Sequence, residues 1–164
     1  MEERLILGLD LSLNSTGYVI VKFTESKDNT IIEVIEKGLI KAKSNETHSK
    51  KLKRQYRRLN QIKEQYSGKN LIVVKENLHY GRPKTAAILG KAHGVADLIF
   101  PHIHAYGPST IKKEVAGNGR VSKEEVEQAV KNMVKLGHEM RFKSDDESDA
   151  VAVAITHYLK IKED

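Results

Sequence analysis

Four acidic residues stand where a chain normally excludes charge. Asp10 ends an apolar run near the N-terminus, Glu76 ends another, and Asp146 and Asp149 lie in the segment DDESDAVAVAITH. A carboxylate at the end of a buried strand costs free energy unless a turn amide, a basic side chain or a metal ion pairs with it. For Asp10 alone, capping of the following polar turn and metal binding both remain open.

The acids near the C-terminus are expected at the start of a helix. Ser144 followed by Glu147 has the spacing of a capping box, which places Asp146 in the first turn and Asp149 one turn further on the same face. Acids at a helix N-terminus oppose the macrodipole, which explains Asp145 and Glu147. This does not explain Asp149, because it lies beside a run of alanine and valine that must pack inward.

Convergence of these four acids would predict a metal site. Four carboxylates without a basic partner repel one another unless cations lie among them. Ligands that are all oxygen favour magnesium or manganese. Two such ions, about 4 Å apart, suit in-line hydrolysis of a phosphodiester. The acids therefore indicate a metal-dependent nuclease.

The charge of the chain favours a polyanionic partner. Lys and Arg number 28 against 22 Asp and Glu, which gives a net charge of +6 and a pI of about 9.4. Much of the positive charge lies in HSKKLKRQYRRLNQIKEQY, residues 48–66, where Leu52, Leu59 and Ile62 recur at helical spacing. This pattern predicts a helix with one face on the core and the other on phosphates, the alternative being a solvated face. The cations are Lys50, Lys51, Lys53, Arg54, Arg57 and Arg58.

Length and composition limit the remaining classes. A chain of 164 residues suits one domain, expected over residues 1–164. The absence of cysteine excludes disulfide frameworks and thiolate zinc sites. The first apolar stretch is interrupted by Asp10 and lacks a cleavage-site pattern, so neither a signal peptide nor a membrane span is predicted. We expect a soluble cytoplasmic protein.

Hydrophobic periodicity predicts how the acids are positioned. Three strands linked as hairpins precede alternating helices and strands, which indicates an α/β protein with a five-stranded mixed sheet flanked by helices. The expected strands are 4–10, 17–23, 31–40, 70–75 and 101–105, and the expected helices are about 47–66, 83–98, 108–115, 122–136 and 146–160.

Several segments match a known family in order and spacing. They are GLDLSLNSTGY, the strand-end glutamate of VVKEN, ILGKAHGVA, YGPSTIKKEVAGNGRVSKEEVEQAV and DESDAVAVAITH. On these motifs the chain resembles the RuvC Holliday-junction resolvases over nearly its whole length. The resemblance implies an RNase H-like fold, a homodimer, and magnesium-dependent paired nicks placed symmetrically across a four-way DNA junction.

The resemblance also implies roles for single residues. The four acids correspond to the family's metal-binding acids, and manganese is expected to substitute for magnesium at two ions per site. Lys112 and Lys123 fall where the family has lysines that contact the cleaved strand. The helix over residues 86–96, with Ala87, Gly90 and Gly94, resembles the family's dimer-forming helix, although small residues at that spacing also suit an ordinary core.

Three features depart from the family pattern. Lys75 precedes the glutamate where relatives have a small or apolar residue, so it either contacts a phosphate or points to solvent. His79 stands near the family's aromatic residue that stacks on an unpaired base, and Tyr80 is beside it, so either ring could stack. The basic helix is more heavily charged than we expect of cellular enzymes, which favours a phage-encoded member acting in a bacterial host cell.

Two other classes compete with a resolvase. An actin-like kinase also ends its first strand in Asp, but that fold needs two lobes and several hundred residues. A non-catalytic protein that binds branched DNA would need only the basic helix, and four clustered acids would weaken its hold on phosphates. Magnesium-dependent nicking of a synthetic junction separates these classes.

Overall fold

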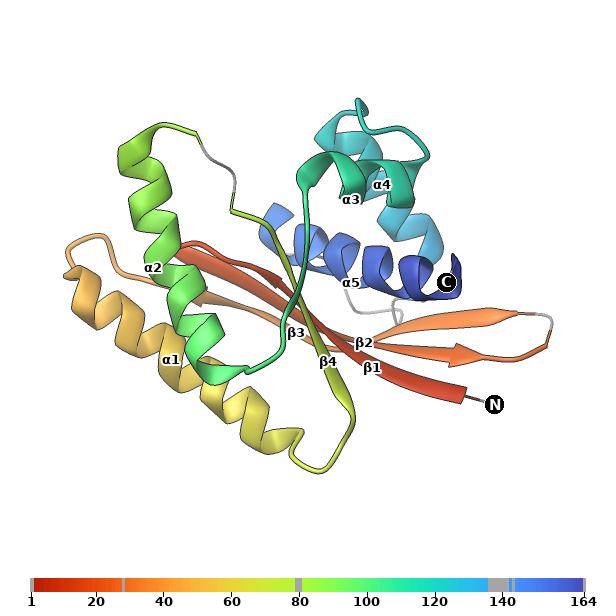
Figure 1. The fold of residues 1–164 in the computed structure, drawn as a ribbon, viewed down its shortest axis with the longest axis horizontal. Helices are drawn as coiled ribbons and strands as arrows, with labels where there is room; N and C mark the ends of the chain where they lie inside the picture. Colours follow the sequence, from red (N-terminus) through yellow and green to blue (C-terminus); the bar gives the residue numbers. More distant parts are fainter. Residues whose placement is uncertain (1, 28, 79–80, 136–141, 143, 164) are drawn as a thin grey trace.

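A central sheet organises the chain (Figure 1). The computed structural model describes residues 2–27, 29–78, 81–135, 142 and 144–163. The strand order is β3-β2-β1-β4-β5, with β1 antiparallel to β2 and parallel to β4, which confirms the predicted five-stranded mixed sheet. The strands are β1 (Glu2–Asp10), β2 (Ser15–Glu25), β3 (Thr30–Lys41), β4 (Leu71–Glu76) and β5 (His104–Tyr106).

Helices cover both faces of the sheet (Figure 1). One core joins α1 and α2 to the sheet, and the other joins α3, α4 and α5 to its opposite face. The fourth predicted helix, 122–136, ends early because Val134 is extended and the Lys135 N–H donates to the carbonyl of Ile32 at 2.9 Å. The helices are α1 (His48–Gln65), α2 (Pro83–Ile99), α3 (Pro108–Ala116), α4 (Lys123–Met133) and α5 (Asp145–Glu163).

Strand β1 shows why the central strands read as nearly continuous apolar runs. Ile6 packs in the core beneath α5, whereas Leu7 and Leu9 pack in the core beneath α1 and α2. A strand buried on both faces needs apolar side chains at successive positions, not at alternate ones. Among the described residues of β1 that follow Glu3, the only carboxylate is Asp10, at the end of the strand.

Two glycines allow α5 to approach the sheet closely. A Cβ on Gly8 would overlap the carbonyl oxygen of Ala150, and a Cβ on Gly17 would overlap that of Asp146. Any larger residue at either position would push the helix away from the sheet. The first turns of α5 therefore lie against the ends of β1 and β2, as the small residues in the sequence predicted.

The start of α5 differs from the prediction in one respect. The hydroxyl of Ser144 has no hydrogen-bond partner among the described residues, so the serine half of the predicted capping box is not formed. Glu147 instead accepts a hydrogen bond from Lys37 of β3 at 2.7 Å. The two side chains are only 2% and 9% exposed, respectively. This buried ion pair ties the first turn of α5 to the sheet.

We expect Lys37→Met to lower the free energy of unfolding by about 3–5 kcal/mol, because it removes the cation beside a buried carboxylate. Chemical denaturation followed by circular dichroism measures this. The double variant Lys37→Met, Glu147→Leu should recover most of the loss, since neither charge then remains. A single variant as stable as the parent chain would show that the pair does not hold α5.

Candidate active site

The acids predicted from the sequence come together at one edge of the sheet. β1 and β4 are parallel neighbours in which Leu9 lies opposite Lys75, so Asp10 and Glu76 follow at the same edge. Parallel strands with their carboxyl ends at one edge present their next side chains together. α5 supplies Asp146, whose backbone touches Gly17, and Asp149 one turn later.

The electrostatics of Asp10 show that these carboxylates sense one another. The pKa of Asp10 is raised to about 7, chiefly by burial and then by the charges of Asp149, Asp146 and Glu76, in that order. The ammonium of Lys123 acts in the opposite direction. Each ionised neighbour makes a further negative charge at Asp10 less favourable. The site therefore needs compensating positive charge.

The turn after β1 does not need Asp10. The Thr16 hydroxyl donates to the carbonyl of Ser12 at 2.7 Å, and the Ser12 N–H donates back to that hydroxyl at 3.2 Å. The buried side chain of Gln55 donates to the same hydroxyl at 3.0 Å. No side chain or amide of residues 11–17, all of them described, donates to the Asp10 carboxylate. These contacts favour a functional over a capping role for Asp10.

The two acids of α5 each contact a donor from elsewhere in the chain. The Ser15 hydroxyl donates to Asp146 Oδ2 at 2.6 Å. Lys123 Nζ lies 2.9 Å from Asp149 Oδ2 and 3.6 Å from Asp145 Oδ2. Burial, with the charges of Asp145 and Asp146, raises the pKa of Asp149, and Lys123 acts in the opposite direction. Burial by itself would lower the pKa of Lys123, but the hydrogen bond and charge of Asp149 raise it overall.

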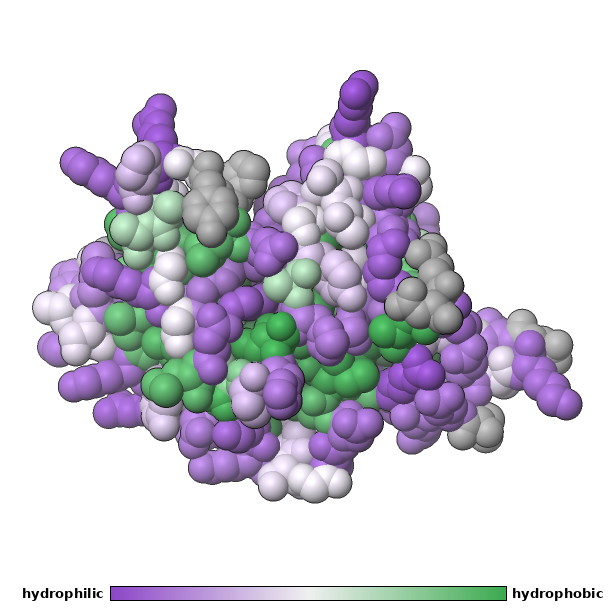
Figure 2. Space-filling view, viewed as in Figure 1, coloured by the Kyte–Doolittle hydropathy of each residue, from purple (hydrophilic) through white to green (hydrophobic). Residues whose placement is uncertain are grey.

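Two cavities meet at Glu76. One, of about 260 Å³, is bounded by Glu76, Asp149, Lys112 and Lys123, and lies between the end of β4 and the helices α3 to α5. The other, of about 190 Å³, lies on the α2 side and is lined by Asp10 together with Glu76. In the space-filling view, the molecule is hollowed between α2 and the α3–α4 pair (Figure 2). The acids thus line a site that solvent and substrate can reach.

Both lysines predicted to contact the cleaved strand lie at the first cavity. Lys123 at the start of α4 is 53% exposed. Lys112 on α3 is half-buried, and its Nζ donates to the carbonyl of Val121 at 2.7 Å. Lys123 is therefore accessible to a substrate while it pairs with Asp149, whereas Lys112 is held by the loop between α3 and α4.

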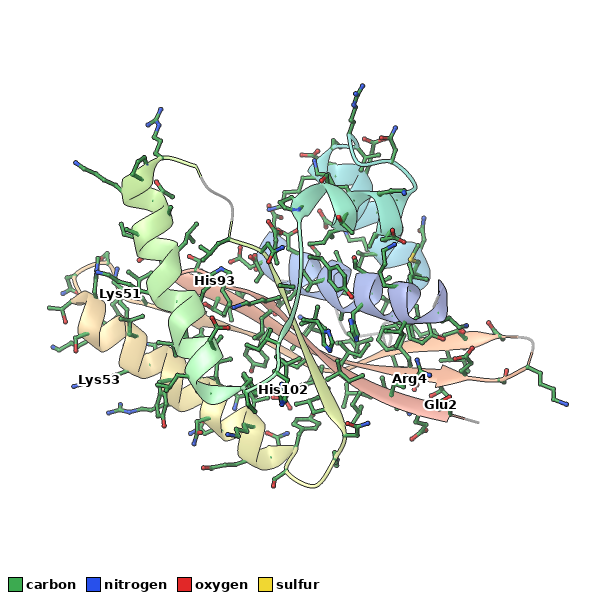
Figure 3. The ribbon with its side chains drawn as sticks, in the orientation of Figure 1. Glu2, Arg4, Lys51, Lys53, His93 and His102 are labelled. Carbon is green, nitrogen blue, oxygen red and sulfur yellow. The ribbon has the colours of Figure 1, made fainter. Side chains whose placement is uncertain are left out.

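His93 lines the second cavity and was missed in the sequence (Figure 3). Its side chain is 6% exposed, and its Nδ1 has no hydrogen-bond partner among the described residues. Burial, with the charge of Lys75, lowers the pKa of His93 to about 4, so the ring is neutral near pH 7. Lys75 itself is 12% exposed and pairs with Asp97, so neither role predicted for it is supported. In the sequence, His93 occupies an ordinary core position of α2, so nothing in the pattern indicated that it lies at the acidic site.

Two further groups of residues were predicted to contact DNA. His79 and Tyr80 fall outside the described residues. The basic helix is α1, on the opposite side of the sheet from α5, so its cations are not part of the carboxylate site.

The acidic site has the donor chemistry of a divalent-cation site. Every candidate ligand is a carboxylate oxygen, which hard cations prefer, and Asp10 needs compensating charge. Within the described parts of the chain, no three histidine or acidic side chains already stand in metal-binding geometry. In this structure Lys123 pairs with Asp149, and Ser15 donates to Asp146, so a bound cation would compete with these two contacts.

The strand order β3-β2-β1-β4-β5, with helices on both faces of the sheet, defines a protein of the RNase H-like fold class. The structure superposes on Thermus thermophilus RuvC in complex with Holliday junction substrate with a TM-score of 0.83 at 22% identity, covering 98% of this chain and 96% of that one. It also matches the fowlpox virus resolvase with Holliday junction DNA, with a TM-score of 0.59 at 14% identity, covering 98% and 99% of the two chains. These likenesses confirm the predicted fold.

Sequence comparison identifies the family. The family model described as crossover junction endodeoxyribonuclease RuvC matches residues 6–157. The RuvC of Alkaliphilus metalliredigens is 34% identical over 157 residues, covering 93% of this chain and 92% of the relative. That of Rhodopirellula baltica is 30% identical over 159 residues, covering 94% and 86%. The chain belongs to the RuvC family of crossover junction endodeoxyribonucleases, which are structure-selective, metal-dependent nucleases.

No helix within the described ranges is long and apolar enough to cross a membrane.

Proposed function

We propose that this protein resolves four-way DNA junctions, and related branched DNA, by paired symmetric nicks in the cytoplasm of a bacterial cell. The observation that carries the proposal is the convergence of Asp10 with three further carboxylates at one sheet edge, in a chain with a net charge of +6. Two curated relatives named crossover junction endodeoxyribonucleases, each at least 30% identical, support the substrate class.

The acids would hold two magnesium ions per site, with manganese able to substitute. The residues are Asp10, Glu76, Asp146 and Asp149. When bound, the cations offset the carboxylate charge, activate the attacking water and stabilise the leaving oxygen. Ser15 orients Asp146, and the buried pair of Lys37 with Glu147 fixes the helix that carries two of the acids.

Lys123 is proposed to contact the scissile phosphate. It lies at the rim of the cavity that Glu76 and Asp149 also line, and its flexible side chain is half exposed. A cation there stabilises the charge that grows on the phosphate oxygens in the transition state. Lys112, fixed beside it, would position the strand. At the junction centre, the ring of His79 or Tyr80 is proposed to stack on an unpaired base.

Paired nicks need two active sites, so we propose a homodimer joined through α2. The outer side of this helix bears Ala87 and Gly94, and Leu98 is 76% exposed. A Cβ added to Gly94 would meet no atom within 4 Å, so a second helix could approach closely there. A two-fold dimer places two identical sites symmetrically about the junction.

The proposal predicts magnesium-dependent, branch-selective cleavage. Four-way junctions labelled on each strand in turn should be nicked at matching positions in opposed strands with magnesium or manganese, and not in EDTA. Cleavage of a replication-fork substrate tests whether other branched DNA is also cut. Linear duplex of the same sequence should remain uncut. Junction binding without nicking in either metal would identify a non-catalytic binding protein, and equal cutting of linear duplex would exclude a resolvase.

A further inference from the structure

The outer face of α1 carries a stripe of cations that the active site does not use. Lys50, Lys53 and Arg57 are exposed and recur at intervals of three and four residues, so they share one side of the helix. The buried residues Gln55 and Leu59 lie on the other side. From Lys50 to Arg57, the helix rises about 10 Å. The stripe therefore follows the helix axis and faces away from the core.

These side chains border a shallow hollow of about 570 Å³. Figure 3 shows Lys53 directed from α1 away from the body of the molecule, with Lys51 near the start of the helix. Lys51 does not line the hollow, because its Nζ donates to Asn14 at 2.6 Å. The lining residues are Glu46, Lys50, Lys53, Arg54, Arg57, Arg58 and Gln61.

The cations of this hollow divide into two groups. Arg54 pairs with Glu46, and Arg58 pairs with Glu36 at 2.7 Å, so these arginines are largely neutralised and held in place. Lys50, Lys53 and Arg57 have no acidic partner among the described residues. Three uncompensated charges along one helix face attract a polyanion.

The chemistry of the stripe selects the kind of polyanion. A membrane-binding helix needs a free apolar face, but the apolar face of α1 is buried in the core. A protein partner needs buried aromatic or aliphatic anchors, and among the residues lining the hollow there are none. Lysines and an arginine on an open face make phosphate contacts, which position DNA without reading its bases.

We propose that the outer face of α1 binds the sugar-phosphate backbone of a duplex arm, away from the site of cleavage. α1 covers the face of the sheet opposite α5, so this surface holds an arm while the acids act on the crossover. The proposal rests on the proposed function for the identity of the nucleic acid. It assigns the phosphate contacts to Lys50, Lys53 and Arg57. Arg54 and Arg58, which are held by their acidic partners, border the same hollow.

The test is the salt dependence of junction binding in calcium, with the full chain. In Lys53→Ala, Arg57→Ala, the slope of log affinity against log salt should become shallower by about 1.8, since each lost phosphate contact removes about 0.9. The loss should be the same for junctions of different sequence. The charge-preserving variant Lys53→Arg, Arg57→Lys should keep the original slope.

A matched control removes two charges elsewhere. Lys27 and Lys135 are exposed on the side of the β2–β3 hairpin, at the other end of the sheet from the start of α1 (Figure 1). Lys27→Ala, Lys135→Ala should leave the slope within error of the parent chain. If the α1 variant kept the parent slope, or if the slope of the control became equally shallow, the α1 surface would be excluded as a DNA-binding site. The proposed nicking activity would not be affected by that result. If the parent chain bound no branched DNA, the proposed function would fall together with this surface.

Discussion

Asp10→Asn is expected to reduce junction nicking in magnesium by several orders of magnitude while the protein stays folded. The substitution keeps the shape of the side chain but removes one of four converging negative charges, so the proposed ions should no longer assemble. Junction binding in calcium or EDTA should hold or strengthen, because less negative charge faces the DNA phosphates. Nicking and binding are measured on one preparation.

The same variant carries a second readout in the absence of metal. Because the pKa of Asp10 is raised to about 7 in the folded protein, its stabilising contribution is complete below the unfolded pKa near 4 and is lost as the pH rises through 7. Asn cannot ionise, so the variant should be more stable than the parent chain above pH 7, by on the order of a few kcal/mol. The gain should shrink as the pH falls toward 4.

Asp145→Asn provides a matched control for charge. Asp145 is the neighbouring acid at the start of α5, but its side chain is 68% exposed and faces solvent beside Lys123. Removing its charge should change nicking only slightly. Parent-level nicking by Asp10→Asn would contradict the metal assignment, whereas loss of folding in that variant would return Asp10 to a structural role.

Lys123→Ala is expected to slow cleavage about a hundredfold and to weaken junction binding much less, because its charge matters most where negative charge grows in the transition state. Single-turnover rates at saturating protein separate the two effects. Lys123→Arg should retain part of the rate, since it keeps the cation.

Lys131→Ala on the same helix removes a lysine that pairs with Glu127 on the surface, and it should leave both quantities nearly unchanged. Equal losses of rate and affinity in Lys123→Ala would make Lys123 a positioning contact only.

The sequence predicted the sheet and the convergence of the acids because both follow from local patterns. Apolar runs that end in Asp10 and Glu76 indicate strands that end at charged side chains. The hairpin between the first two strands places β2 beside β1, whereas the other neighbour of β1 is the parallel strand β4, which follows a crossover through α1. The small residues of α5 indicated close packing, which the contact of Ala150 with Gly8 confirms.

Contacts between distant segments could not be predicted in this way. Glu147 looked like a helix-start acid, yet it pairs with Lys37 from β3, more than a hundred residues earlier. Arg54 and Arg58 looked like free cations, but acids outside their own helix neutralise them. His93 occupies a core position of α2, and only the folded chain places it beside Asp10. Side-chain partners depend on tertiary packing, which helix and strand periodicity do not encode.

The most direct test of the central claim uses a supercoiled plasmid that extrudes a cruciform. Paired symmetric nicks within one bound complex convert the plasmid to linear molecules, whereas independent nicks give relaxed circles first. We predict linear product as the first species in magnesium, with supercoiled plasmid unchanged in EDTA or with Asp10→Asn. Relaxed circles as the main product, or equal cutting of a plasmid without the cruciform, would contradict the account.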